Sequence, residues 1–134
     1  MKKLLIVDDE PDIRRTLSLL FKDSYEVLEA GDGNEAVRLA GSRAPDLVFL
    51  DVVMPGMDGL AALESLKKVR PNMIVIMLTG EQEIAVAKEA LDHGASMYVT
   101  KPYEPNFLRA EVERLLTAGP AKANEKPWRV AEEP

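Results

Sequence analysis

The chain has 134 residues, of which 46% are hydrophobic and 30% charged, as is typical of one globular domain with a real core. Its formal net charge of −6, without a cluster of Lys or Arg, argues against direct binding of nucleic acid, because phosphate contacts need a basic surface. Cysteine is absent and His93 is the only histidine, so disulfides, thiolate metal sites and multi-histidine metal sites are excluded.

No apolar run approaches the roughly 18 residues that a membrane span needs. Asp8 interrupts the N-terminal apolar stretch too early for a signal peptide. We therefore expect no membrane segment and a cytoplasmic protein.

Short apolar strands alternate with amphipathic helices along the chain. The predicted strands are 4–7, 25–30, 47–50, 73–78 and 95–99, and the predicted helices are 11–22, 36–40, 60–69, 81–92 and 104 or 105 to 116, with Gly41 ending the second helix. Four of the strands are apolar throughout, which is typical of a parallel sheet covered on both faces, whereas 25–30 alternates and indicates a sheet edge. The pattern predicts an α/β fold, a doubly wound (βα)5 five-stranded parallel sheet.

The regular pattern stops near Thr117, where Gly, Pro, Lys and Glu become frequent. We therefore expect one domain over residues 1–117 and a flexible linker or tail over 118–134. Trp128 lies in this tail, either as an isolated exposed aromatic residue, the simpler interpretation, or as an anchor that docks on a partner domain.

Polar residues end four of the predicted strands: Asp8 and Asp9, Asp51, Thr79 and Lys101. Asp51 alone could be an ordinary strand terminator. Because the carboxyl ends of parallel strands share one edge of the sheet, where ligands of open α/β sheets bind, we expect the five side chains to meet there.

The residue types predict phosphoryl chemistry at this edge. Three carboxylates repel one another unless a cation joins them, and an oxygen-only cluster suits Mg²⁺, with Mn²⁺ as an alternative. Lys101 and Thr79 can contact phosphoryl oxygens. Asp51 is the best-placed nucleophile for forming an acyl phosphate.

These motifs resemble the receiver domain of two-component response regulators. The resemblance rests on Asp8-Asp9, on Asp51 with the loop 54–59 (MPGMDG), on Thr79-Gly80 and on Lys101-Pro102, and it covers about residues 2–116. It implies a flavodoxin-like or CheY-like strand order of 2-1-3-4-5 and a cis peptide bond before Pro102.

The resemblance also implies roles for the site residues. Asp51 would accept a phosphoryl group from a sensor histidine kinase or a phosphotransfer protein. Asp8, Asp9 and Asp51 would hold Mg²⁺ together with the backbone carbonyl of Val53. Lys101 would pair with Asp51 and then with the phosphoryl group. The protein would be a signalling switch in a phosphorelay, catalysing only its own phosphorylation and a slow autodephosphorylation, because Val53 cannot orient a hydrolytic water.

Output would depend on Thr79 and Tyr98 as switch residues. They would alter the face built from the fourth helix, fifth strand and fifth helix, which contacts a downstream effector or output domain. The resemblance leaves open a phosphorylation-dependent homodimer, but Glu111 stands where winged-helix members of the family usually have Arg, which argues against their salt-bridged dimer.

Two other functions remain open from the sequence. A small Mg²⁺-dependent phosphatase with an aspartyl nucleophile would usually carry a nucleophile and an acid two residues apart after the first strand, and a cap domain. This chain has neither feature. An interaction module that works without phosphorylation is disfavoured by the intact acidic cluster, Thr79 and Lys101.

Overall fold

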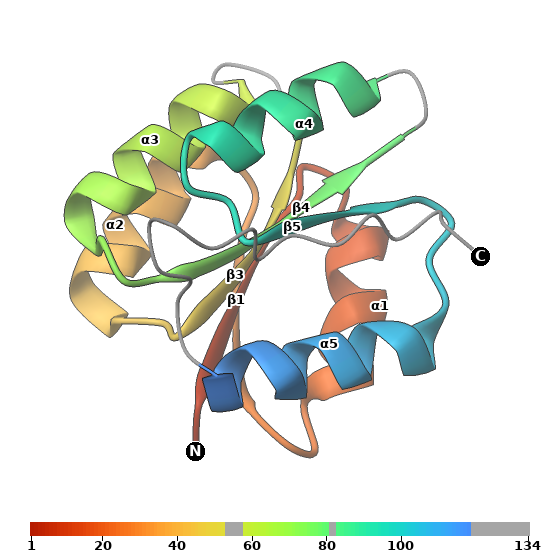
Figure 1. Ribbon diagram of the computed structural model, residues 1–134. Helices are drawn as coiled ribbons and strands as arrows, with labels where there is room; N and C mark the ends of the chain where they lie inside the picture. Colours follow the sequence, from red (N-terminus) through yellow and green to blue (C-terminus); the bar gives the residue numbers. More distant parts are fainter. Residues whose placement is uncertain (53–57, 81–82, 119–134) are drawn as a thin grey trace.

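The computed structural model describes residues 1–52, 58–80 and 83–118 of the chain. Within these ranges five strands alternate with five helices (Figure 1). In chain order they are β1 (Lys3–Val7), α1 (Pro11–Phe21), β2 (Glu26–Ala30), α2 (Gly33–Arg43), β3 (Leu47–Asp51), α3 (Gly59–Val69), β4 (Ile74–Thr79), α4 (Ile84–Asp92), β5 (Met97–Thr100) and α5 (Pro105–Ala118).

The strands form one parallel sheet in the order β2-β1-β3-β4-β5, which confirms the predicted fold class. Every residue of the central strand β3 is buried, whereas most residues of the edge strand β2 are only half-buried. The sequence explains the contrast, because β3 (LVFLD) is apolar up to its last residue and β2 (EVLEA) contains two glutamates.

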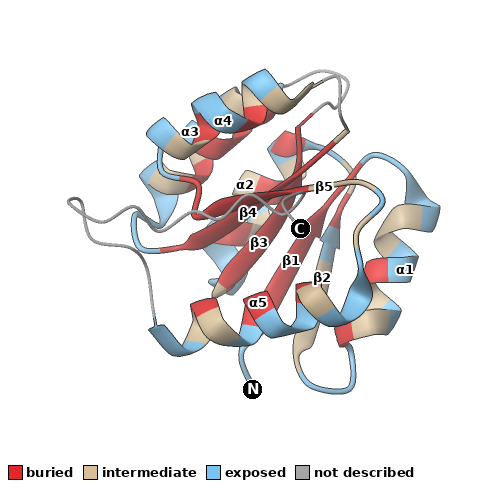
Figure 2. Cartoon of the chain, turned by 45° about the vertical axis from the view of Figure 1, so that its right-hand side comes forward, coloured by how far each residue is buried: buried red, intermediate tan, exposed pale blue. Residues whose placement is uncertain are grey.

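Helices cover both faces of the sheet. α2, α3 and α4 pack on one face, and α1 and α5 pack on the other (Figure 1). Because successive strand residues point to opposite faces, Leu5 and Val7 belong to the core beneath α2–α4, and Leu4 and Ile6 to the core beneath α1 and α5. Figure 2 shows buried residues along the strands and exposed ones on the outer sides of the helices. With both faces covered, the ends of the strands are left for a functional site.

One predicted helix end is wrong. α2 does not stop at Gly41 but continues to Arg43, and the left-handed residue Ala44 (φ 51°) follows it. Pro45 comes next, and the ring of a proline disfavours helical backbone in the residue before it. Gly41 is therefore an interior helix residue, and the chain turns three residues later than predicted.

α2 also begins three residues before its predicted start, at Gly33, and α4 begins at Ile84, after its predicted start at 81. The remaining differences are small. β2 begins at Glu26, one residue after its predicted start, and α5 continues to Ala118, two residues beyond its predicted end. The tail with Trp128 lies outside the described residues, so the domain division remains a prediction. Among the described residues, no helix combines the length and apolar character needed to cross a membrane.

Candidate functional site

Three carboxylates meet at the carboxyl edge of the sheet. Asp8 and Asp9 directly follow β1, and Asp51 is the last residue of β3. The two strands are neighbours in the sheet, and their pairing ends where Val7 of β1 lies opposite Leu50 of β3. Each carboxylate offers one oxygen, and these three oxygens lie within 4.8 Å of one another. The structure therefore brings together the acidic residues that the sequence analysis selected.

The three carboxylates differ in exposure. Asp8 is completely buried, Asp51 is 9% exposed, and Asp9 is exposed. One oxygen of Asp8, Oδ1, accepts a hydrogen bond from the backbone N–H of Glu10 at 2.9 Å. Its other oxygen, Oδ2, has no hydrogen-bond partner among the described residues. A buried carboxylate oxygen without a donor is costly, and the Lys101 ammonium, 3.6 Å away, is too far to donate a hydrogen bond to it, so this atom fits a metal ligand.

Lys101 is the cation that the structure places beside the acidic group. It follows β5, and its Nζ lies 3.6 Å from Oδ2 of Asp8 and 3.6 Å from Oδ2 of Asp51. The Lys101–Pro102 peptide bond is cis. One ammonium against three carboxylates leaves the pocket with formal charge −2, which a divalent cation would offset. An all-oxygen donor set of this charge suits Mg²⁺ or Mn²⁺.

The two residues expected to act as switches are both buried. Thr79 ends β4, and its hydroxyl donates a hydrogen bond of 2.9 Å to the carbonyl of Gly80. Tyr98 lies in β5 opposite Met77, and its side chain is part of the core beneath α2–α4. In this structure Tyr98 thus occupies an inward position.

On α5, Glu111 is only 5% exposed and accepts hydrogen bonds from the Arg114 guanidinium.

Val53, the expected carbonyl ligand, lies outside the described residues, as does the rest of the segment 53–57. The chain is described again from Asp58, whose carboxylate caps α3 by accepting from the Ala61 N–H at 2.8 Å. Gly59 N–H then donates to the Val52 carbonyl at 3.0 Å. A Cβ at Gly59 would lie 2.5 Å from that carbonyl oxygen, so only glycine permits this close return of the chain to the end of β3.

Two further residues near the site were missed by the sequence analysis. The guanidinium of Arg14, in α1, donates a hydrogen bond of 2.6 Å to the backbone carbonyl of Asp8. Tyr103 follows the cis peptide bond, and burial together with the negative charge of Asp8 raises the pKa of its phenol above the usual value. Neither residue stands at a strand end, which was the signal used to select candidates.

Comparison with known proteins agrees with this geometry. A model of the response regulator receiver domain family matches residues 4–113. Sporulation initiation phosphotransferase F of Bacillus subtilis (strain 168) is 36% identical over 124 residues, which make up 92% of this chain and 98% of that protein. The probable transcriptional regulator ycf27 of Cyanophora paradoxa is 42% identical over 116 residues, or 86% of this chain and 48% of that protein. The chain thus spans about half the length of the curated transcriptional regulators that it matches.

Solved structures show the same fold. A response regulator receiver domain protein from Clostridium thermocellum superposes with a TM-score of 0.84 at 31% identity, covering 88% of this chain and 96% of that one. The receiver domain of NtrX from Brucella abortus gives a TM-score of 0.81 at 38% identity, covering 85% and 98% of the two chains.

Proposed function

Because this chain belongs to the family of response regulator receiver domains, the signalling modules of two-component systems, we propose that Asp51 is its site of phosphorylation. The donor is a phosphohistidine on a sensor histidine kinase or a phosphotransfer protein. The observation that supports this most strongly is the meeting of three carboxylates and the Lys101 ammonium at the ends of β1, β3 and β5.

In the transfer, an oxygen of Asp51 forms a bond to phosphorus while the bond between phosphorus and the histidine nitrogen breaks. The electron pair of the broken bond stays on the imidazole nitrogen, and the product is an acyl phosphate. A bound Mg²⁺ supplies charge neutralisation for the phosphoryl oxygens. In this proposal Asp8, Asp9, Asp51 and the Val53 carbonyl hold the ion.

Lys101 and Thr79 stabilise the phosphorylated form. The Lys101 ammonium, 3.6 Å from Asp51, is close enough to shift onto a phosphoryl oxygen attached to that residue. The Thr79 hydroxyl exchanges its bond to the Gly80 carbonyl for a bond to another phosphoryl oxygen. The movement of Thr79, together with Tyr98, changes the surface formed by α4, β5 and α5. An effector, an output domain or a second copy of the chain contacts that surface.

We further propose that the acyl phosphate is long-lived. Val53 stands two residues after Asp51, and its aliphatic side chain cannot orient a water for hydrolysis. The chain therefore works as a switch rather than as a turnover enzyme, and we propose that it does so in the cytoplasm. Its membership of the receiver family does not favour the aspartyl phosphatase or the phosphorylation-independent module.

Incubation with acetyl phosphate and MgCl₂, followed by intact-protein mass spectrometry, tests the proposal. The wild type is expected to gain the mass of one phosphoryl group, and Asp51→Ala none. Asp23→Ala, which removes an exposed carboxylate after α1, is the matched control and should behave like the wild type. Modification of Asp51→Ala, or steady hydrolysis of a free phosphate ester by the wild type, would contradict the proposal.

A further inference from the structure

We propose that Arg14 is a positioning residue for the metal pocket. Its guanidinium orients the peptide group that joins Asp8 to Asp9, and this orientation determines where both carboxylates point. The inference rests on the proposed function, because it concerns the same Mg²⁺ pocket.

The backbone of Asp8 is held on both sides. Its carbonyl accepts a hydrogen bond of 2.6 Å from Nη1 of Arg14, and its N–H donates to the carbonyl of Ala30, in β2, at 3.2 Å. The bond from a guanidinium is charge-assisted and therefore stronger than one between neutral groups. The Asp8 carbonyl belongs to the same rigid peptide plane as the Asp9 N–H. Arg14 therefore restrains the rotation of that plane.

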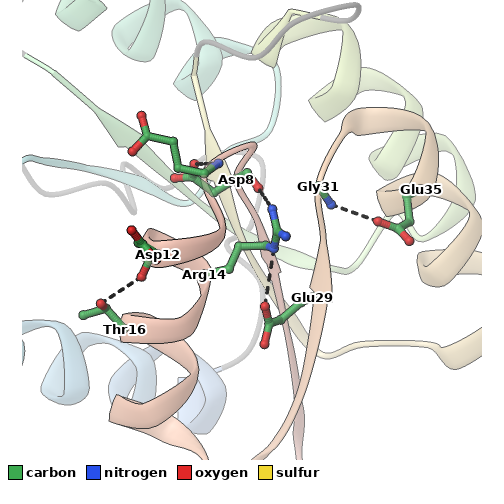
Figure 3. Close-up of polar contacts among 8 residues, drawn as sticks. Asp8, Asp12, Arg14, Thr16, Glu29, Gly31 and Glu35 are labelled. Atoms are coloured by element: carbon green, nitrogen blue, oxygen red, sulfur yellow. Dashed lines mark hydrogen bonds and ion pairs between the residues drawn. The ribbon is translucent and has the colours of Figure 1, made fainter.

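The guanidinium is itself held by β2 and the turn after it (Figure 3). Nε of Arg14 lies 3.4 Å from Oε1 of Glu29, and the Arg14 side chain is only 20% exposed. Nη1 also lies close to Gly31, where an added Cβ would be 3.3 Å away. Gly31 N–H in turn donates to Oε1 of Glu35 at 2.9 Å, which connects this turn to α2. Arg14 is thus held in place by contacts from a neighbouring strand.

This arrangement matters for a metal because the two adjacent aspartates have different environments. Asp8 is buried with one oxygen lacking a donor, while Asp9 is exposed, and each must still bring one oxygen within 4.8 Å of the others. Turning their shared peptide would move both carboxylates away from Asp51. The guanidinium of Arg14 donates to the Asp8 backbone, not to its carboxylate. Because Glu29 offsets its positive charge, Arg14 does not compete with a cation in the pocket.

Isothermal titration of the full chain with MgCl₂ tests the role directly. Arg14→Ala is expected to weaken Mg²⁺ binding roughly tenfold, the low end of the range for groups that orient metal ligands. The Mg²⁺ affinity of Arg14→Lys should lie between those of the wild type and Arg14→Ala, because one ammonium cannot reproduce both contacts of the guanidinium. Arg15→Ala, which removes the same charge from an exposed position of the same helix, should bind like the wild type.

Gly31→Ala perturbs Arg14 without changing it. The backbone of Gly31 is not left-handed, so alanine fits the turn, but its Cβ displaces the guanidinium by a few tenths of an ångström. We expect weaker Mg²⁺ binding than in the wild type, and no further weakening when Gly31→Ala is added to Arg14→Ala. Gly31→Ala alone keeps the test valid even if Arg14→Ala folds poorly, because Mg²⁺ binding equal to that of the wild type would then overturn the inference.

The outcomes separate the two proposals. If the wild type binds Mg²⁺ and Arg14→Ala binds it equally well, with only the free energy of unfolding lowered, Arg14 merely ties α1 to β2 and the inference is overturned. An equal effect of Gly31→Ala with and without Arg14 would also overturn it. If the wild type itself neither binds Mg²⁺ nor becomes phosphorylated, the proposed function fails.

Discussion

Replacement of Asp8 by Asn is expected to stabilise the metal-free protein while abolishing much of its response to Mg²⁺. The substitution removes one negative charge from the pocket and keeps the shape of the side chain. The amide oxygen can still accept the hydrogen bond that Oδ1 of Asp8 receives from the Glu10 N–H. The change is therefore mainly electrostatic.

Its magnitude follows from the distances in the pocket. At an effective dielectric constant of about 20, each carboxylate repulsion costs at least about 3.5 kcal/mol, the value at 4.8 Å, which is the upper limit of the distances between the oxygens, and the attraction to Lys101 at 3.6 Å contributes about 4.6 kcal/mol. Asp8 faces two such repulsions and one attraction, which leaves a net repulsion of at least about 2 kcal/mol. Because Asp9 is exposed and screened by solvent, we expect Asp8→Asn to raise the free energy of unfolding by about 1 kcal/mol.

Urea unfolding followed by circular dichroism, with EDTA and with MgCl₂, measures both effects. Asp12→Asn is the matched control, because it removes the same charge from an exposed position in the first turn of α1. There the carboxylate interacts favourably with the helix dipole, so its loss should lower the free energy of unfolding by about 0.3–1 kcal/mol. The reasoning is refuted if Asp8→Asn destabilises the metal-free protein, or if Mg²⁺ stabilises this variant as strongly as the wild type.

Three further predictions concern the contact between Gly59 and Val52, the lifetime of the phosphate and the behaviour at high pH. Gly59→Ala should lower the free energy of unfolding in urea by about 1–3 kcal/mol, since the new Cβ would lie 2.5 Å from the Val52 carbonyl oxygen. Val53→Asn should speed the loss of phosphate, followed by mass spectrometry, because an amide can orient a hydrolytic water. Because the pKa of Tyr103 is raised, the folded state keeps a proton that the unfolded state loses near pH 10.0. The stability of the protein should therefore fall as the pH rises above that value. Tyr103→Phe should reduce this fall in alkaline melting curves.

Each of these predictions has an outcome that contradicts it. Gly41→Ala is the control for the first, because Gly41 lies in the interior of α2 and its added Cβ would make an ordinary contact, 3.7 Å from Val69 in α3, so the substitution should not destabilise the protein. Equal stability of Gly59→Ala and Gly41→Ala would disprove the claim of a close return of the chain. Unchanged or slower loss of phosphate from Val53→Asn would contradict the proposal that Val53 makes the acyl phosphate long-lived. An undiminished alkaline fall in Tyr103→Phe would show that another group is responsible.

Much of the fold and the site could be predicted because both depend on local patterns. Uninterrupted apolar strands indicate a sheet buried on both faces, and parallel strands bring their last residues to one edge. Asp8, Asp51 and Lys101 could therefore be placed together before any contact was known. Their separation in sequence is large, but the direction of each strand is sufficient to bring their ends together.

The remaining features depend on contacts that a local pattern does not contain. Asp8 and Asp9 are identical neighbours, yet only the first is buried, because successive residues at a strand end point in different directions. Arg14 occupies a position in α1 that reads as ordinary polar surface. Its contacts with Glu29 and Gly31 arise only when β2 pairs with β1. Gly41 was misread because a helix interior can accept glycine when the next favourable stop is a few residues away.

The most direct test of the central claim is to locate the phosphoryl group on the chain. Reduction of the acetyl phosphate-treated protein with borohydride converts an aspartyl phosphate into homoserine, which peptide mass spectrometry places at one position. We predict homoserine at position 51 alone, formed only when MgCl₂ is present and lost in Asp8→Asn. Homoserine at another aspartate, or equal yield in EDTA, would contradict the account.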